Sequence, residues 1–376
     1  MSSLITDLTV PPAVRATRLT AREAADAHGA RRSAENPRIA TVPYPMTIVF
    51  TVAGFIIAEL VSLFFPQIAH VSFPQGQLWI FLLTGQEAYR ALLVILAVVY
   101  AIAGIVDLHA ADKREYYRSR APFRFAMGVA LALWDIAGTK LQTLPQPFFP
   151  GPAKVMEAFV TDGGYIVLNT LYSARLFIAG FIVGVVLGVV TGVLIGWFDK
   201  AYYWVFPVLK ITGVIPSVAW MPFALTLMPT PFAAAVFLLV IASWFPVAFL
   251  TAQGIKGTPK MLVEAARTLG ASTPYILFHV AIPNATPSIF TGIGMANSLS
   301  FLTLVISEMM GQPGGLGYYI DQAKAWSSYY KILAAIVVMA ILFSLIMKII
   351  EVVRGRMLRW QKGLVRLATL NLTISP

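Results

Sequence analysis

The chain has 376 residues, of which 58% are apolar and only 12% are charged, and its mean hydropathy is +0.76. Soluble domains carry about 25% charged residues, so the composition predicts a protein whose main solvent is lipid. Cysteine is absent, which excludes a disulfide framework, a thiol nucleophile and a Cys-ligated metal. The net charge of +11 would by itself fit a nucleic-acid partner, but the distribution of the basic residues explains it otherwise.

The first segment, residues 1–45, is polar and has no sustained apolar period. We expect a disordered cytoplasmic tail there, with at most a short helix at 19–29. A second tail is expected at 366–376.

Eight segments of about 20 residues are long and apolar enough to cross a hydrocarbon core of about 30 Å. They lie near 46–66, 88–110, 124–142, 174–197, 203–226, 231–252, 284–307 and 332–353. Asp135 and Lys140 interrupt the third, and three prolines break the fifth. The predicted fold is therefore an all-α polytopic membrane protein with about eight transmembrane helices.

The basic residues support this layout. With the amino terminus inside, 20 of the 28 Lys and Arg residues fall in cytoplasmic segments, and only Lys154, Lys324 and Lys331 fall on the opposite side. Cytoplasmic loops are enriched in Lys and Arg, so both termini are expected to be cytoplasmic. The positive charge is thus a topology signal, and no nucleic-acid partner is needed to explain it.

The fourth span carries a glycine at every fourth position. These residues form a shallow groove along one side of a helix, where another backbone can approach closely. They are Gly180, Gly184, Gly188, Gly192 and Gly196. We interpret the groove as a helix-packing surface.

A polar, helix-favouring island at 255–282 separates two apolar spans. Pro259 favours a helix start, Gly270 favours its end, and Ser272 or Thr273 can cap a second short helix. Pro283 then marks the start of the next span. The pattern predicts a helix–turn–helix elbow on the cytoplasmic membrane face, where Ala265 and Ala266 leave room for a partner and Glu264 can accept hydrogen bonds.

The region from about Phe149 to Arg366 resembles permeases of the nitrate/sulfonate/taurine group of ABC importers. The most specific match is the EAA loop, Glu264-Ala265-Ala266 with Gly270 and Pro283. Four weaker patterns agree in order: Pro150-Gly151-Pro152, Ser173 to Phe181, Ile215 to Pro222, and Ser307-Glu308-Met309 with Gly315-Leu316-Gly317-Tyr318.

The resemblance implies a type I permease core of six helices at 121–365, preceded by two extra helices at 46–120. It implies that the elbow seats in a separate ABC ATPase, which binds the ATP and Mg, while this chain binds no cofactor or metal and is not an enzyme. It further implies a homodimer in the lipid of a bacterial inner membrane, served by a periplasmic or lipid-anchored substrate-binding protein. The cargo would be a small solute, in particular an anion such as nitrate, a sulfonate, taurine or bicarbonate. Candidate gating or pathway residues are Pro216, Pro222, Glu308, Gly315 and Gly317.

Two other functions remain open at this point. A proton-coupled secondary transporter could use Glu59, Asp135 and Glu308 as a relay, although no inverted repeat is evident. A membrane scaffold or enzyme is the second, although the four histidines are scattered without ligand spacing. Glu308 itself is interpreted as the anchor of the adjacent glycine loop, with substrate contact as the alternative, and Glu59 and Asp135 as pairing with Lys140 or Arg90.

Overall fold

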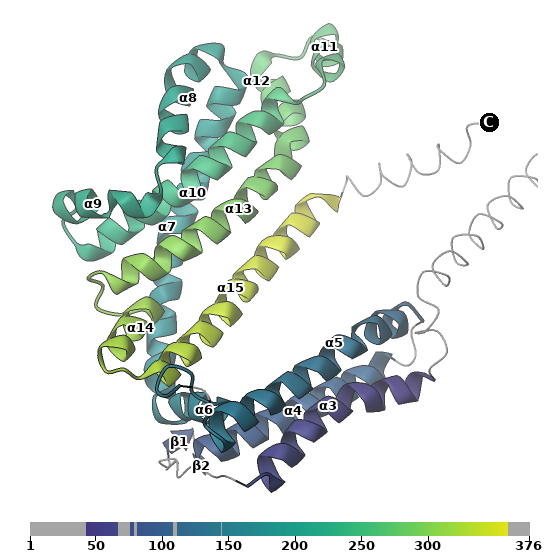
Figure 1. Ribbon diagram of the computed structural model, residues 1–376. Coiled ribbons are helices and arrows are strands. Elements are labelled where there is room, and N and C mark those ends of the chain that lie inside the picture. Colours follow the sequence, from purple (N-terminus) through teal and green to yellow (C-terminus); the bar gives the residue numbers. More distant parts are fainter. Residues whose placement is uncertain (1–42, 67–75, 79–80, 108–110, 144, 360–376) are drawn as a thin grey trace, which may run out of the picture. The chain divides into compact units, whose positions relative to one another are not determined.

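The computed structural model describes residues 43–66, 76–78, 81–107, 111–143 and 145–359 (Figure 1). The predicted tail at 366–376 and nearly all of the tail at 1–45 lie outside these residues. The chain divides into two compact units. One contains the described residues within Met1–Val71 and Tyr89–Thr143, and the other contains those within Ser72–Ala88 and Leu144–Lys362.

The first unit is built from three long helices. They are α3 (Tyr44–Phe64), α4 (Gly85–Val106), whose first turn lies in the other unit, and α5 (Ala111–Asp135), which continues into one π-helical turn, η2 (Ile136–Lys140). α3 and α5 touch backbone to backbone because each has a glycine at the crossing. A Cβ on Gly54 would lie 2.5 Å from the carbonyl oxygen of Phe125, and one on Gly128 would meet the backbone of Gly54. α5, which the sequence grouped with the permease core, therefore packs on α3 in this unit.

The second unit holds most of the described helices. In chain order they are α6 (Pro152–Thr161), α7 (Gly163–Trp197), α8 (Asp199–Val214), η3 (Ser217–Trp220), α9 (Met221–Leu227), α10 (Pro231–Lys256), α11 (Lys260–Thr268), α12 (Thr273–Ile276), η4 (Leu277–Ala281), α13 (Ile282–Met309), α14 (Leu316–Ala325) and α15 (Tyr329–Met357). A small antiparallel hairpin, β1 (Gly76–Leu78) with β2 (Phe81–Leu83), packs against α6 through β1. It is the one departure from an all-helical fold among the described residues.

The centre of the second unit is a layer of three helices, in which α10 contacts both α7 and α13 (Figure 1). The glycine stripe of α7 faces α10. A Cβ on Gly188 would lie 2.7 Å from Cβ of Val247, one on Gly192 would lie 2.5 Å from Cβ of Thr251, and the other three meet α10 in the same way. The facing residues of α10 also recur every fourth position, so a ridge of α10 side chains fits the glycine groove of α7.

Six helical segments of the described chain are long and apolar enough to span a membrane: α3, α4, α7, α10, the continuous stretch Thr273–Met309, and α15. The pair Asp199–Val214 and Ser217–Leu227, bent by 97°, gives a seventh if it counts as one broken span. The predicted span at 124–142 is not among them. α5 ends at Asp135, so a helical span would have to include its amino-terminal half, which is rich in Lys and Arg. The all-α polytopic class is confirmed.

Candidate functional site

The predicted elbow is formed by α11, α12 and η4. α11 ends in a Schellman motif: the N–H of Gly270 donates to the carbonyl of Arg267 (2.9 Å), and the N–H of Ala271 donates to that of Ala266 (3.1 Å). Gly270 has φ +82°, a left-handed conformation that glycine adopts without the penalty of a Cβ. Ser272 occupies the N-cap position of α12, without a side-chain hydrogen bond.

The elbow has a buried root and an exposed tip. Leu277 and Ala281 of η4 and Ala285 of α13 are buried in a cluster with Ile255 at the end of α10. In contrast, no residue of α11 is buried, and the apolar side chains of Met261 and Leu269 are 75% and 88% exposed. A tip with this much exposed apolar surface, rigidly rooted in a helical bundle, is typical of a protein-docking surface.

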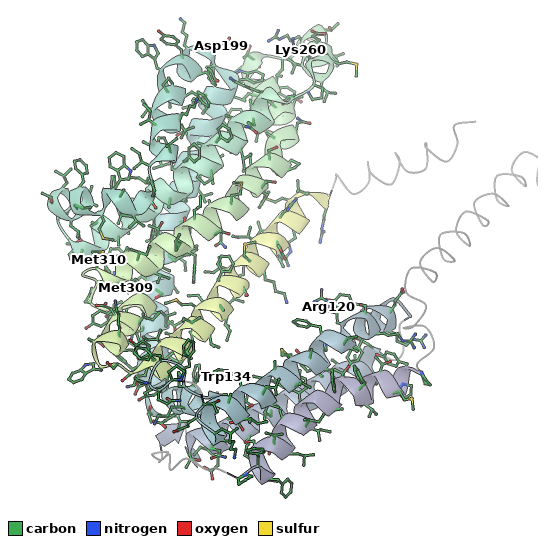
Figure 2. All side chains as sticks on the ribbon, viewed as in Figure 1. Arg120, Trp134, Asp199, Lys260, Met309 and Met310 are labelled. Carbon is green, nitrogen blue, oxygen red and sulfur yellow. The ribbon has the colours of Figure 1, made fainter. Side chains whose placement is uncertain are left out.

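The elbow residues predicted from the sequence occupy different parts of this arrangement. Glu264 and Ala265 are exposed on α11, Ala266 is partly buried, and Gly270 forms the turn. Pro283 lies in the first turn of α13, at the root. Figure 2 shows Lys260 at the start of α11 and Met310 just after α13 at opposite ends of the second unit.

Glu308 lies buried at the end of α13 remote from the elbow, and it holds the glycine loop that precedes α14. Its Oε2 accepts the backbone N–H of Gly317 (2.8 Å). α7 contributes two further acceptors: Asn169 Oδ1 takes the N–H of Gly315 (2.9 Å), and Ser173 Oγ takes the N–H of Leu316 (2.8 Å). Three side chains from two helices therefore fix three consecutive amides at the start of α14, where the glycine loop enters the helix.

Pro216 and Pro222 both lie at the break between α8 and α9. Pro216 is the N-cap of the 3₁₀ helix η3, and Pro222 is in the first turn of α9. The hydroxyl of Ser217 hydrogen-bonds that of Thr303 on α13 (2.7 Å). The bend is thus tied to the central layer.

The three acidic residues considered for a proton relay are not brought together by a common hydrogen-bond chain in the described residues. Arg90 pairs with Glu59 at 2.9 Å, while Lys140 donates to the backbone carbonyl of Ser62 at 2.7 Å. Glu59 and Asp135 belong to the first unit, whereas Glu308 belongs to the second. Among the described residues, no group of three or more His, Cys, Asp or Glu side chains could hold a metal ion.

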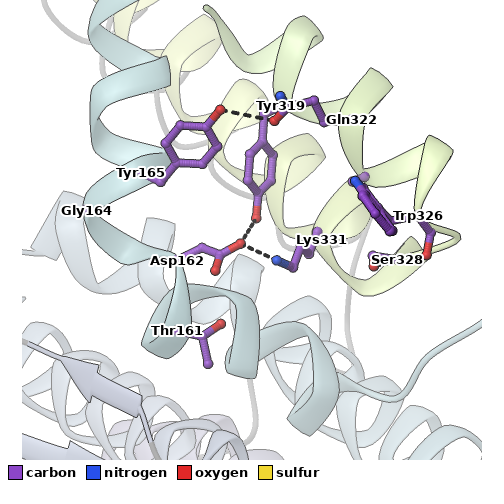
Figure 3. A pocket seen from close by; sticks show the side chains of 10 residues that line it. Thr161, Asp162, Gly164, Tyr165, Tyr319, Gln322, Trp326, Ser328 and Lys331 are labelled. Carbon is purple, nitrogen blue, oxygen red and sulfur yellow. Dashed lines mark hydrogen bonds and ion pairs between the residues drawn. The ribbon is translucent and has the colours of Figure 1, made fainter.

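A polar cavity of roughly 760 Å³ was not predicted from the sequence. It lies where the α6–α7 junction, α14 and the start of α15 meet (Figure 3). Asp162 accepts both the hydroxyl of Tyr319 (3.0 Å) and the Nζ of Lys331 (2.6 Å) on one carboxylate oxygen. Burial, and then the charge of Asp162, raise the pKa of Tyr319 above its usual range, so its hydroxyl stays protonated as the donor. The residues come from segments far apart in sequence, and no local motif linked them.

Long apolar helices, an exposed elbow and a carboxylate-held loop together characterise a polytopic helical membrane protein. The family model described as "Binding-protein-dependent transport system inner membrane component" matches residues 184–360. This segment belongs to that family, which confirms the family predicted from the sequence.

Named relatives agree with that assignment. The putative aliphatic sulfonates transport permease of Bacillus subtilis is 27% identical, over 62% of this chain and 86% of the relative. The nitrate import permease of Synechococcus elongatus is 26% identical, over 55% of this chain and 76% of the relative. The taurine transport system permease of Escherichia coli is 26% identical, over 62% of this chain and 87% of the relative.

Among solved structures, a chain of the MetNI methionine ABC transporter in inward facing conformations matches with a TM-score of 0.45 and 21% identity. The match covers 51% of this chain and 96% of that chain.

Proposed function

We propose that this chain is the permease subunit of an ATP-driven importer and that a separate ATPase seats on the elbow at 255–282. The observation that carries the proposal is the helix α11, none of whose residues is buried, on a buried root. Its exposed apolar side chains, Met261 and Leu262, are suited to a cleft in another protein.

The packing of the root suggests how the elbow transmits force. Its buried cluster joins η4 and α13 to the end of α10, with Val193 and Trp197 of α7 packed against it. Close-packed interiors transmit displacement because they have few voids. A push on α11 by closing ATPases therefore moves the ends of α10 and α13 together, and alternating access follows from the shift of these helices. Glu264, Ala265 and Ala266 contact the ATPase, Gly270 sets the angle of the turn, and Pro283 starts the helix that is moved.

The opposite end of α13 is assigned to the gate. Glu308, through Gly315 and Gly317, couples the end of that helix to the loop before α14. Pro216 and Pro222 allow the bend between α8 and α9, which is tied to α13 through Thr303.

The permease acts as a homodimer in the inner membrane, with both termini cytoplasmic. ATP and Mg are bound by the partner ATPase, and a periplasmic or lipid-anchored binding protein delivers the solute. The division into an extra part at 46–120 and a core at 121–365 stays a prediction. The solute is a small anion or zwitterion such as nitrate, a sulfonate, taurine or bicarbonate, and the support is the named cargo of the nitrate, sulfonate and taurine relatives.

Reconstitution tests the proposal. The chain is coexpressed with an ABC ATPase and a substrate-binding protein from the same organism, and uptake of labelled taurine and nitrate into proteoliposomes is measured. Uptake is expected only with ATP and all components. Uptake by the lone chain, driven by a pH gradient without ATP, would establish the secondary-transporter alternative instead.

A further inference from the structure

The cavity at the α6–α7 junction contains opposite charges side by side. Lys331 Nζ lies 2.6 Å from Asp162 Oδ2, and the two side chains are 27% and 21% exposed. Both side chains keep part of their surface open to the cavity, so a ligand that offers each partner a replacement charge can insert between them. A bare anion at Lys331 would instead meet the neighbouring carboxylate.

Aromatic rings form much of the remaining wall. Tyr165 and Tyr319 pack edge to face with ring centroids 5.7 Å apart, and Trp326 lines the cavity while 83% exposed. Aromatic faces attract organic ammonium groups through the ring quadrupole. Gln322, held by the Tyr165 hydroxyl at 3.0 Å, adds an amide to the same wall (Figure 3).

We propose that this cavity binds a small zwitterion, with the ammonium group between Asp162 and the aromatic rings and the anionic group at Lys331. The volume of roughly 760 Å³ is within the range of small-molecule sites. The inference rests on the proposed function only in identifying the ligand with the transported solute.

Binding to the purified full chain in nanodiscs, measured by isothermal titration calorimetry without ATPase, tests the site. The probes are taurine as a zwitterion, nitrate as a bare anion and ethylammonium as a bare cation. Saturable binding of taurine is expected, with at least tenfold weaker binding of the other two. Equal binding of nitrate would overturn the zwitterion assignment, and absence of taurine binding would overturn the site.

Three variants locate the site. Asp162→Asn and Lys331→Gln should each weaken taurine binding at least tenfold. Trp326→Ala, at an exposed position that leaves the ion pair intact, should weaken it about threefold to tenfold.

The matched control is Lys154→Gln, which removes the same charge from an ion pair of 2.7 Å with Glu157 on α6. Lys154 lies outside the residues that line the cavity, so this variant should bind taurine normally. Unchanged binding in folded Asp162→Asn, Lys331→Gln and Trp326→Ala would refute the proposal, as would an equal loss in Lys154→Gln.

The two proposals fail separately. Taurine binding by a chain that never associates with an ATPase would refute the importer function and leave the site standing. ATP-driven uptake by a complex whose cavity variants bind taurine like the wild type would refute the site and leave the importer function standing.

Discussion

Gly270 is the residue on which the shape of the elbow depends. Its φ of +82° lies in the left-handed region, and a Cβ there would meet no other atom within 4 Å. Gly270→Ala therefore introduces backbone strain alone, about 1–2 kcal/mol. We expect roughly fivefold to thirtyfold faster amide exchange in 260–276 and a comparable loss of ATPase association.

Gly355→Ala is the matched control, because Gly355 is also unobstructed but lies in α15 without a positive φ. It should leave both measurements unchanged. An elbow that exchanges at the wild-type rate in Gly270→Ala would contradict the role assigned to the Schellman turn.

Two glycines between α13 and α14 allow the effect of backbone strain to be distinguished from that of a steric clash. Gly311 and Gly315 have φ +106° and +120°, but a Cβ on Gly311 meets nothing, whereas one on Gly315 overlaps the carboxylate of Glu308. Thermal unfolding in detergent should therefore show a larger loss for Gly315→Ala than for Gly311→Ala. Equal losses would mean that the Glu308 contact does not constrain the loop.

Glu308 should act as a hydrogen-bond acceptor. Glu308→Ala leaves the N–H of Gly317 buried without its partner, which costs about 1–3 kcal/mol. Glu308→Gln keeps a carbonyl acceptor at the same place and should cost clearly less in the same unfolding measurement. If Gln is as destabilising as Ala, the negative charge, rather than the hydrogen bond, is what the loop requires.

At the scale of helices, the α7–α10 contact depends on the absence of side chains. Gly188→Leu places a branched side chain where a Cβ alone already lies 2.7 Å from Val247, and overpacking of this kind costs about 1–3 kcal/mol or more. Val186→Leu, on an exposed part of the same helix, should change stability by less than about 0.5 kcal/mol. Similar unfolding temperatures for both variants would contradict the close packing of α7 on α10.

Local sequence patterns were sufficient for these elements. The four-residue period of α7 could be read directly, because helical periodicity places such residues on one side of the helix. The turn at Gly270 was also predictable from local sequence. The proline before α11 and the glycine after it determine where the helix begins and ends through the backbone of a few neighbouring residues. The ends of α11 were accordingly placed near their observed positions, whereas α7 begins at Gly163, before its predicted start at 174.

Elements that depend on distant partners were not predictable in the same way. α5 was grouped with the core, but its packing on α3 is decided by Gly54, more than 70 residues before Gly128. The β1–β2 hairpin is too short to produce a period. The cavity combines Asp162 with Tyr319 and Lys331, which no local motif links, so only the fold brings them together.

At the scale of the whole molecule, two candidate functional surfaces lie at opposite ends of the second unit. The elbow lies at one end, and the cavity with the Glu308 loop lies at the other, where α14 joins α13 and α15 (Figure 1). The continuous helical stretch Thr273–Met309 connects the two. In this account, the ATPase acts at one end and the solute is admitted at the other.

The absence of cysteine from the chain permits the most direct test of the central claim, that an ATPase seats on the elbow. Single-cysteine variants Leu269→Cys at the tip and Met310→Cys at the opposite end of α13 are each combined with cysteine-scanned ATPase, and disulfide cross-linking is measured in native membranes. We expect efficient, ATP-sensitive cross-links from position 269 and none from position 310. Cross-links from 310 alone, or from neither position in an intact complex, would contradict the seating of an ATPase on the elbow.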